Sequence, residues 1–381
     1  MIEKIHIQNF KSIYDLELEV GRVNLFIGEN GSGKSNLLEA LVFVSASESN
    51  MLANEFLVSR GLRVPEPELM RSAFYQKDKK RNIQIDIQFN VNNIKEYVLV
   101  NDNTEYSKWY DLNFRIRELD IKAIYACEKG IQKMLKPEYK KDYVSEYKQL
   151  LHSLKSKQDI QLESFIIFSP EYEVLRNFYN EGQIQPLGVK GEGLYKLLKV
   201  VNSYEDKSYI KTIIESLQLF NWFDNIIIPD ELAFGEKKLI IKDKYLYTEI
   251  DQRSTNEGFL FILFYVTLIV AKETPKAFAI DNVDSFLNPK LCTKLMTLIT
   301  DLAKKYDKQI FLTTHNPAIL DGIDLKDKEQ KLFVVSRKKS TGYTRTREIT
   351  VENKPKSATN QPLKLSEAFL RGYLGGLPKG F

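Results

Sequence analysis

The residues with the clearest chemical potential form a glycine-rich turn between an apolar run and an expected helix. After the mainly apolar residues 23–27, the next eight read Gly-Glu-Asn-Gly-Ser-Gly-Lys-Ser, which meets the phosphate-binding pattern G-x-x-x-x-G-K-[ST]. In this arrangement backbone N–H groups and the positive end of the following helix cradle phosphates. We therefore predict a nucleoside triphosphate site in which Lys34 reaches the outer phosphates and Ser35 ligates Mg²⁺. The residues predicted to bind the nucleotide here are Asn30, Gly31, Ser32, Gly33, Lys34, Ser35 and Asn36.

A second, acidic anchor is expected far along the chain, because P-loop enzymes hold Mg²⁺ with an acidic residue at the end of another core strand. Residues 277–280 are all apolar, and Asp281 follows them directly. This pattern is typical of a buried parallel strand that ends at the active edge of a sheet. Asp281 is therefore the second predicted metal-binding residue, beside Ser35.

A histidine stands at the end of a later apolar run, residues 310–312, after two threonines. The chain has three histidines, and His315 lies where a side chain could contact the γ-phosphate or the attacking water. A neutral imidazole donates a hydrogen bond there near neutral pH. A histidine after a strand is, by itself, more often a loop residue, but the order of P-loop, Asp281 and His315 favours a catalytic role.

This order resembles the ABC-type ATPases of the RecF, SMC and OLD (overcoming-lysogenization-defect) group. Residues 2–12, with the pattern Ile-x-Asn-Phe-Lys-Ser, are similar to the first hairpin of that group. Two glycine-rich segments, residues 186–194 and 372–378, resemble the smaller OLD-like AAA family ATPases of bacterial antiphage defence operons. The resemblance implies an α/β fold with a P-loop ABC-type ATPase core: a mixed sheet with flanking helices, an antiparallel N-terminal subdomain and an inserted helical lobe. It also implies ATP and Mg²⁺ as cofactors.

One position in the expected catalytic turn departs from the pattern of that group. Where the resemblance implies a Glu after the magnesium-binding Asp, this chain has Asn282, which can orient a water but cannot accept its proton. Asp284, two residues further on, is the alternative proton acceptor. The predicted catalytic residues are thus Asp281, Asn282, Asp284 and His315. Hydrolysis is expected to be slow or dependent on a partner.

The expected signature turn also departs from the pattern. Residues 254–258 read Ser-Thr-Asn-Glu-Gly where the group has a Ser-Gly-Gly or Ser-Asp-Gly type of turn. Gly258 still permits a turn before the apolar helix expected over residues 259–271, and Ser254 or Asn256 could donate to a γ-phosphate. The resemblance implies that two ATP sites form when P-loop and signature turn meet across a homodimer or a higher oligomer.

Composition favours a cytoplasmic location. The net charge is only +4, so the whole chain is not a polycation that would bind nucleic acid. Cys127 and Cys292 are far apart and lack zinc-site spacing, which fits a reducing compartment. We see no signal segment and no membrane span, because the longest apolar run, residues 259–271, is shorter than the roughly 20 residues that a bilayer needs. Residues 353–356 do not complete the guanine-reading pattern Asn-Lys-x-Asp, which favours ATP.

Local patterns divide the chain into four parts. Alternating apolar residues over 82–90 predict a half-buried strand paired with 97–100, and a hairpin is expected over 237–247. The predicted parts are 1–104, the N-terminal part of the core with the P-loop; 105–235, an inserted, mainly helical lobe; 236–325, the C-terminal part of the core with the signature turn, Asp281 and His315; and 326–381, a last strand, a basic turn and a tail.

The predicted lobe carries lysines interleaved with tyrosines at helical spacing. They are Lys129, Lys133, Lys136, Lys140, Lys141, Lys148, Lys155 and Lys157, with Tyr139, Tyr143 and Tyr147. One hypothesis is a face that follows the phosphates of DNA or RNA. The other, which we favour, is a solvated helix face with the tyrosines packed inward, since Glu138, Asp142 and Glu146 dilute the charge.

These features together predict an ABC-type ATPase that binds and hydrolyses ATP. By resemblance, it senses or regulates a separate effector in antiphage defence, such as an HNH or TOPRIM nuclease. No Asp-x-Asp cluster follows His315, so we expect no nuclease within this chain. Two alternatives stay open: a RecF-like DNA-repair ATPase that clamps DNA, and an ATP-gated scaffold with little hydrolysis, which Asn282 would allow.

Overall fold

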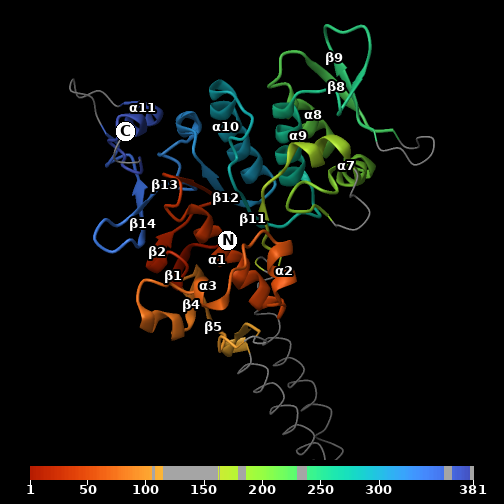
Figure 1. Ribbon diagram of the computed structural model, residues 1–381. Helices are drawn as coiled ribbons and strands as arrows, with labels where there is room; N and C mark the ends of the chain where they lie inside the picture. The colour runs from red at the N-terminus through yellow and green to blue at the C-terminus, as the bar shows by residue number, and fades with distance from the viewer. Residues whose placement is uncertain are drawn as a thin grey trace, which may run out of the picture.

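The computed structural model describes residues 1–104, 108–114, 162, 164–178, 186–229, 238–355 and 363–377. Its strands form a six-stranded central sheet, a five-stranded sheet and a three-stranded sheet. In Figure 1 the five-stranded sheet lies below the central sheet, and the three-stranded sheet lies at the upper right. The predicted fold class, a mixed sheet with flanking helices and an antiparallel N-terminal subdomain, is confirmed.

The central sheet gathers strands from distant parts of the chain. In spatial order they are β14 (Thr344–Ile349), β13 (Gln330–Arg337), β3 (Val23–Ile27), β12 (Gln309–Thr314), β11 (Ala277–Ile280) and β7 (Ile167–Phe168). All are parallel except β14, which pairs antiparallel with β13. Every residue of β3, β11 and β12 is buried, which explains why these strands are mainly apolar. Because parallel strands end at the same edge, Gly28, Asp281 and His315 all follow strands at that edge.

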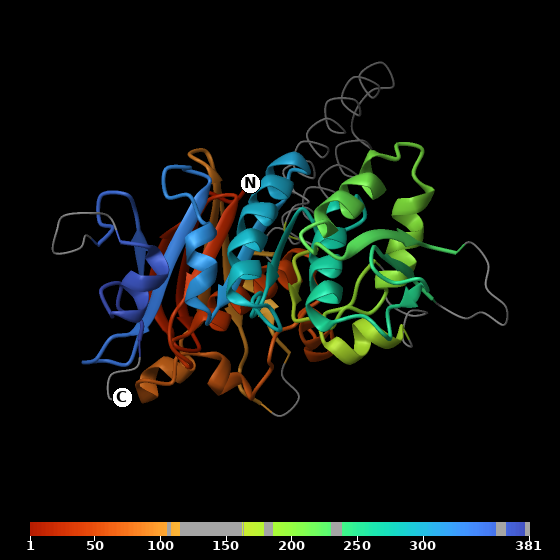
Figure 2. The same cartoon turned by 90° about the horizontal axis from the view of Figure 1, so that it is seen from above.

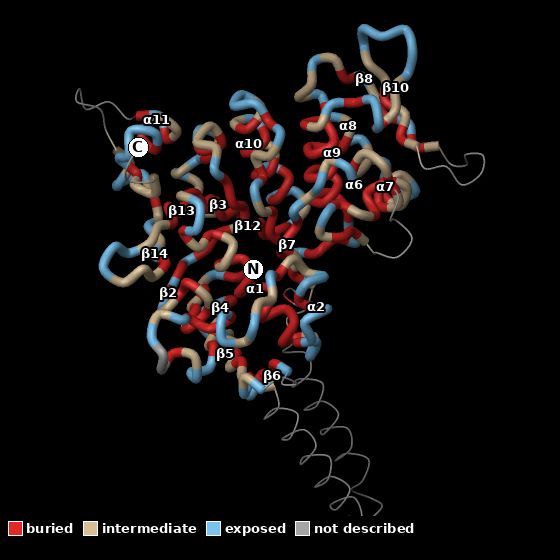
Figure 3. Tube along the Cα trace, in the orientation of Figure 1, coloured by how far each residue is buried: buried red, intermediate tan, exposed pale blue. Residues whose placement is uncertain are grey.

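Helices cover both faces of the central sheet. Phe26 on β3 packs into one hydrophobic cluster with α1 (Lys34–Glu48), whereas its neighbours Leu25 and Ile27 pack on the other face with α9 (Glu257–Val270) and α10 (Pro289–Lys305). Figure 3 shows the resulting buried layers on either side of the sheet. The apolar helix predicted over residues 259–271 is therefore confirmed as a core helix, α9.

The five-stranded sheet is antiparallel and forms the N-terminal subdomain. Its order is β2 (Ile13–Glu19), β1 (Lys4–Phe10), β4 (Ile83–Asn90), β5 (Asn93–Val100) and β6 (Tyr110–Asp111). The half-buried strand predicted over residues 82–90 is confirmed as β4, whose alternate side chains are buried. Its partner begins earlier than the predicted residue 97, because the first half of β5 is solvent-exposed and carries no apolar signal.

The three-stranded sheet corrects one prediction. It consists of β8 (Phe223–Ile227), β9 (Ile240–Asp243) and β10 (Ile250–Asp251). The hairpin expected over residues 237–247 is present, but it ends later than predicted: β9 pairs antiparallel with β10, which begins only at Ile250, and the exposed Tyr245 and Tyr247 lie in the connection between them. Strand β9 also pairs with β8. The sheet lies beside α7 (Leu194–Ser203) and α8 (Ser208–Leu217) (Figure 1).

Several short helices complete the described part of the chain. They are α2 (Asn54–Ser59), α3 (Pro67–Met70), the 3₁₀ helix η1 (Gln76–Lys80), α6 (Tyr172–Asn177), the 3₁₀ helix η3 (Pro317–Gly322) and α11 (Leu365–Leu370). Figure 2 shows α11 and β14 at one end of the molecule and α7 and α8 at the other. The edge of the sheet at which β3, β11 and β12 end, which we call the nucleotide edge, lies between these ends.

The lysine-rich face predicted over residues 129–157 lies outside the described residues, so both hypotheses about it remain predictions. Strand β7 comes from the stretch predicted as the inserted lobe and forms an edge of the central sheet. Among the helices that the structure describes, none combines the length and the apolar character needed to cross a membrane.

Candidate nucleotide-binding site

The loop from Gly28 to Gly33 connects β3 to α1 and depends on close backbone approaches. Gly31 and Gly33 have φ angles of 74° and 107°, and Gly33 caps the N-terminus of α1. A Cβ on Gly33 would lie 2.2 Å from Thr344 Oγ1, and one on Gly28 would lie 2.1 Å from the Val335 carbonyl oxygen. Only glycine fits at these two positions. The loop therefore presents the N-terminus of a long helix at the edge of the sheet, as a phosphate site requires.

The other predicted loop residues differ in exposure. Asn30 and Gly31 are exposed, whereas Ser32 is fully buried and its hydroxyl has no hydrogen-bond partner within the described parts of the chain. Asn36 lies one turn into α1 and donates from Nδ2 to Ser12 Oγ at 2.6 Å. Ser12 belongs to the turn between β1 and β2, so the first hairpin contacts the P-loop helix directly.

Lys34 is the buried cation of the site. Its side chain is 6% exposed, and Nζ donates to the carbonyl oxygens of Gly28 at 2.9 Å and Glu29 at 3.1 Å. Burial lowers the pKa of the Lys34 ammonium to about 8, although nearby carboxylates, Asp281 first among them, act in the opposite direction. A buried ammonium held only by carbonyl oxygens is well placed to receive an anion.

Ser35, at the start of α1, faces Asp281, which follows β11. Ser35 Oγ lies 3.2 and 3.4 Å from the two carboxylate oxygens of Asp281. Thr313 Oγ1 donates to Asp281 Oδ1 and accepts from the Asn282 backbone N–H at 2.9 Å, which fixes the orientation of the carboxylate. A hydroxyl and a carboxylate are the hard oxygen ligands that Mg²⁺ prefers. The residues present therefore fit the predicted magnesium site.

Among the described residues, no group of three or more His, Cys, Asp or Glu side chains is arranged to hold a metal ion. In P-loop proteins Mg²⁺ keeps waters and phosphate oxygens as ligands and needs few from the protein.

The two residues considered for water activation occupy the turn after β11. Asn282 is exposed and has a φ of 54°, a left-handed conformation that Asn tolerates better than most residues. Asp284 is half-buried, and its Oδ1 accepts a hydrogen bond from Thr314 Oγ1 at 2.7 Å. The structure thus ties Asp284 to the end of β12 and leaves the side chain of Asn282 toward solvent.

His315 follows β12 and lies beside the P-loop. Its side chain hydrogen-bonds to the backbone of Gly28. Burial lowers the pKa of the His315 imidazole, and the positive charge of Lys34 lowers it further, although Asp284 and Asp281 oppose the shift. His315 is therefore neutral at pH 7, the form that can donate one hydrogen bond and accept another.

The expected signature turn lies at the N-terminus of α9. Asn256 caps that helix, since its Oδ1 accepts from the Phe259 backbone N–H at 2.9 Å. Ser254 is exposed, and its Oγ donates to Asp251 Oδ1 at 3.3 Å. Gly258 packs against the turn after β11, because a Cβ there would lie 3.3 Å from the Phe286 carbonyl oxygen. The structure therefore joins the signature turn to the loop that follows Asp281 in the same copy.

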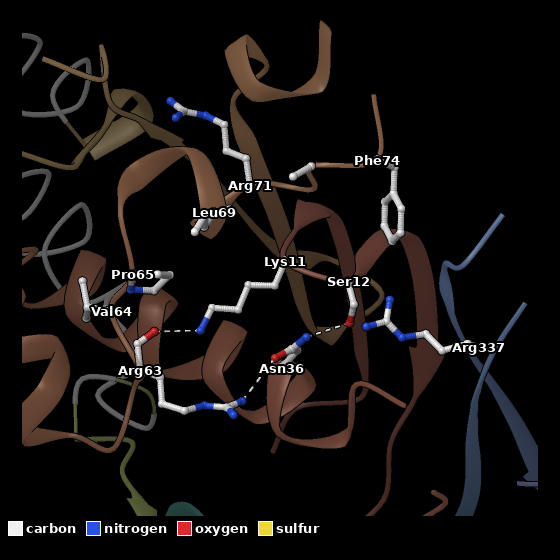
Figure 4. Close-up of a pocket in the computed structure, with 11 residues that line it drawn as sticks. Lys11, Ser12, Asn36, Arg63, Val64, Pro65, Leu69, Arg71, Phe74 and Arg337 are labelled. Atoms are coloured by element: carbon white, nitrogen blue, oxygen red, sulfur yellow. Dashed lines mark hydrogen bonds between the residues drawn. The ribbon is translucent and has the colours of Figure 1, made fainter. Parts of the chain in front are cut away.

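A cleft of about 650 Å³ beside the P-loop helix adds residues that the sequence did not mark as a site. Figure 4 shows it between the first hairpin, α1 and β13. Its lining includes Lys11, Ser12, Asn36, Arg63, Phe74 and Arg337. The cleft adjoins the N-terminal turn of α1, to which Asn36 belongs.

Two cationic groups of the cleft are held by a carboxylate inside α1. Glu39 is 1% exposed and accepts from Lys11 Nζ and, at 2.6 Å, from Arg63 Nε. Arg63 also reaches Asn36 Oδ1 at 3.4 Å. A charged residue within the apolar sequence of α1 is the signal that could have revealed this arrangement, because a buried carboxylate needs cationic partners.

The hairpin of β13 and β14 supports the tip of the P-loop. Arg337 Nε donates to the Gly31 carbonyl oxygen at 2.8 Å, and Thr344 Oγ1 donates to the Ser32 carbonyl oxygen at 2.9 Å. The basic turn predicted after the last strand is therefore a hairpin connection, and one of its arginines contacts the loop that would hold phosphates.

The fold and this edge are those of a P-loop ATPase domain. The sequence model described as "AAA ATPase domain" matches residues 1–221, more than half of the chain, and the chain therefore belongs to that family. Residues 256–321 match a second model, described as "AAA domain, putative AbiEii toxin, Type IV TA system".

Relatives match over shorter stretches. An uncharacterized protein of Methanocaldococcus jannaschii is 34% identical over 113 residues, which cover 28% of this chain and 50% of that protein. The DNA replication and repair protein RecF of Porphyromonas gingivalis is 31% identical over 112 residues, which cover 29% of each. The chain thus spans half or less of the length of these relatives.

Among solved structures, an SMC head bound to the C-winged helix domain of ScpA is similar, with a TM-score of 0.55 and 15% identity. The alignment covers 92% of this chain and 98% of that one. At this identity the similarity shows the fold, and it supports the predicted ATPase core.

The lowered pKa of Lys34 predicts pH-dependent nucleotide binding. Bound phosphates favour the charged ammonium, so affinity is highest below the free-state pKa of about 8 and falls as the pH rises above it. We expect Mg-ATP to bind about tenfold more weakly at pH 9 than at pH 7, measured by calorimetry.

Two variants at the same position control this measurement. Lys34→Ala should lose roughly ten- to hundred-fold in affinity at pH 7, since a charged partner is worth about 1.5–3 kcal/mol. Lys34→Arg keeps its charge throughout this range and should bind with an affinity that does not change between pH 7 and pH 9. Equal wild-type affinity at both pH values would contradict the assignment.

Proposed function

We propose that this protein is an ATP-driven switch in which two copies close on two ATP molecules. Each ATP would lie between the P-loop of one copy and the signature turn of the other. The observation that carries the proposal is the position of the signature turn: Ser254 and Asn256 are exposed, and Gly258 packs on the turn that follows Asp281. A second copy could therefore reach both the nucleotide and the catalytic turn with one surface.

In the proposed mechanism each polar group at the edge has a separate role. Lys34 neutralises the outer phosphates, and Ser35 and Asp281 hold Mg²⁺, which would offset the charge that develops on the phosphate oxygens. Thr313 keeps the Asp281 carboxylate oriented. Neutral His315 donates a hydrogen bond to the γ-phosphate or positions the attacking water.

Slow turnover is part of the proposal. Asn282 can hold a water but cannot take its proton. Asp284 has a carboxylate, but its Oδ1 already accepts a hydrogen bond from Thr314 Oγ1, which holds the group at the end of β12. An ATPase of this kind would spend most of its cycle with nucleotide bound, which suits a switch. In the extreme case the protein would bind ATP and hardly hydrolyse it, and it would then be an ATP-gated scaffold.

We infer that the switch regulates a separate effector in antiphage defence, for which an HNH or TOPRIM nuclease is the expected type. Support comes from the resemblance of residues 186–194 and 372–378 to OLD-like ATPases. In the structure both segments lie at the nucleotide edge. The segment from Gly188 to Gly193 accepts backbone hydrogen bonds from Ser169 and Glu171, which come after β7, and Gly376 lies beside Gly28.

A RecF-like DNA clamp is the second candidate, favoured by the 31% identity to RecF over 112 residues. One face of the five-stranded sheet is unsuited to DNA phosphates, because β2 exposes Asp15, Glu17 and Glu19. DNA binding that weakens steeply with salt would support this candidate over the effector switch.

A mixing experiment tests the composite site. Lys34→Ala and Ser254→Arg should each abolish hydrolysis as homodimers, because one removes the phosphate cation and the other obstructs the exposed turn. A mixed dimer keeps one intact P-loop opposite one intact signature turn. Co-expressed variants should therefore recover roughly a quarter of the wild-type rate, since half of the dimers are mixed and each has one working site.

Light scattering provides the companion measurement, with Mg-ATP expected to increase the dimer fraction of wild type but not of Lys34→Ala. No recovery in the mixture, together with an unchanged size on adding ATP, would show that each copy works alone.

Changes at Asn282 test the origin of slow turnover. General-base help is worth about a hundred- to ten-thousand-fold, so Asn282→Glu should raise the steady-state rate. Asn282→Asp is the matched variant, because Asp tolerates the left-handed φ of 54° better than Glu. If Asp284 is already the base, wild type should turn over at about 1–10 per second and Asp284→Ala should be inactive. Ordinary wild-type turnover that survives Asp284→Ala would overturn this account of the turn.

The effector role is tested with the protein encoded next to this one. We expect the two to co-purify, and phage resistance of cells that carry both to be lost with Lys34→Ala. Stable, salt-sensitive DNA binding by the isolated ATPase without co-purification would instead favour the repair candidate.

A further inference from the structure

The last described segment returns to the nucleotide edge and contacts the loop after His315. Helix α11 packs beside η3, which follows His315 after one residue. Ser366 on α11 donates from its backbone N–H at 3.0 Å and from Oγ at 2.6 Å to the carboxylate of Asp321 on η3. Leu365, Ala368 and Phe369 are buried in the hydrophobic cluster that also contains α9 and α10. This segment is therefore anchored to the His315 loop.

Residues 371–377, which we call the glycine turn, continue from α11 toward the P-loop. Gly372, Gly375 and Gly376 have φ angles of 75°, 70° and 78°. The turn is held by hydrogen bonds from Tyr373 N to the Ala368 carbonyl oxygen at 2.9 Å and from Gly375 N to the Gly372 carbonyl oxygen at 3.0 Å. Leu374 is 1% exposed, and its carbonyl oxygen accepts from Arg347 on β14. The turn therefore has a defined conformation.

Gly376 lies directly against the start of the P-loop. A Cβ on this residue would lie 2.6 Å from Val334 Cγ1 and 3.5 Å from the Cα of Gly28. Gly28 is the residue whose backbone bonds to His315 and whose carbonyl oxygen accepts from Lys34 Nζ. The same segment thus contacts η3, which follows His315, through Ser366, and contacts Gly28 through Gly376.

The two sides of the P-loop are supported independently. Thr344 and Arg337 hold its tip, where the N–H groups of Gly31 to Lys34 would bind phosphates. The glycine turn holds its beginning, beside His315. Displacing the glycine turn should therefore affect the position of His315 more than the affinity for phosphates.

We propose that the glycine turn is a positioning element for ATP hydrolysis: Gly376, with the tether from Ser366 to Asp321, sets the placement of His315 against Gly28. This inference rests on the proposed ATPase function. The glycine turn itself makes no contact with the nucleotide in this proposal. Its effect is on the rate of the chemical step, with binding left nearly unchanged.

Gly372 provides a matched control for Gly376. Both have nearly the same positive φ, so an alanine brings similar backbone strain at each, but a Cβ on Gly372 meets nothing within 4 Å. We expect Gly376→Ala to lower the single-turnover rate of ATP hydrolysis roughly ten- to hundred-fold, the cost of a misplaced catalytic group. Its Kd for Mg-ATP should stay within about twofold of wild type, and Gly372→Ala should resemble wild type in both.

A compensating variant distinguishes positioning from general damage. Val334→Ala removes the Cγ1 atom that a Cβ on Gly376 would meet, so Gly376→Ala combined with Val334→Ala should recover rate relative to Gly376→Ala alone, and Val334→Ala alone serves as reference. Ser366→Ala tests the tether to Asp321 without adding an atom, because it removes the hydroxyl that donates to that carboxylate. This variant should lower the rate without changing the Kd for Mg-ATP.

The outcomes separate this inference from the proposed function. Wild type that neither binds nor hydrolyses ATP would overturn the ATPase assignment itself. Active wild type with equal rates for Gly376→Ala, Gly372→Ala and Ser366→Ala would overturn the positioning role alone. If Gly376→Ala fails to fold, the rate and Kd of Ser366→Ala decide the question, and a parallel loss of both would also contradict the proposal.

Discussion

The buried ammonium of Lys34 is the charge on which the arrangement of the nucleotide edge depends. A lysine that is 6% exposed would lose much of its hydration, and only two carbonyl oxygens of the P-loop replace it directly. The carboxylates of Asp281 and Asp284 offset part of this cost from across the edge, and the same positive charge helps to keep His315 neutral. Phosphate oxygens would complete the environment of this cation. The affinity for an anion is therefore stored in the fold before any ligand arrives.

The central sheet can hold this charge in place because the backbone of β13 and a side chain of β14 enclose the P-loop. Val335 leaves no room for a Cβ on Gly28, and Thr344 leaves none on Gly33. Both neighbours belong to β13 and β14, strands from far along the chain. The geometry of the loop is thus set by tertiary packing as well as by its own glycines. The first hairpin adds a third support, since Ser12 bonds to both Asn36 and Thr344.

The parts of this edge that the sequence predicted share a physical origin. Strands β3, β11 and β12 are buried on both faces, so each is mainly apolar, and Gly28, Asp281 and His315 follow them directly. Pairings across long stretches had no such signal. Neither the pairing of β8 with β9 nor the ion pairs of Glu39 follow from local periodicity, because each depends on residues brought together by the fold. The exposed first half of β5 was missed for the opposite reason, since solvent allows any polar sequence there.

The turn after β11 combines chemistry with backbone strain. Asn282 and Phe286 both have positive φ, 54° and 59°, and for a bulky side chain such as Phe this conformation is costly. Phe286 is also 60% exposed, and its ring lies 5.1 Å from that of Phe261 on α9. Strain persists only where surrounding contacts enforce it, and here Gly258 at the start of α9 packs against the Phe286 backbone. Helix α9 therefore connects the signature turn to the conformation of the catalytic turn. A second copy that docked on the N-terminus of α9, as proposed, would therefore act on the turn of Asn282 and Asp284 through Gly258 and the Phe286 backbone.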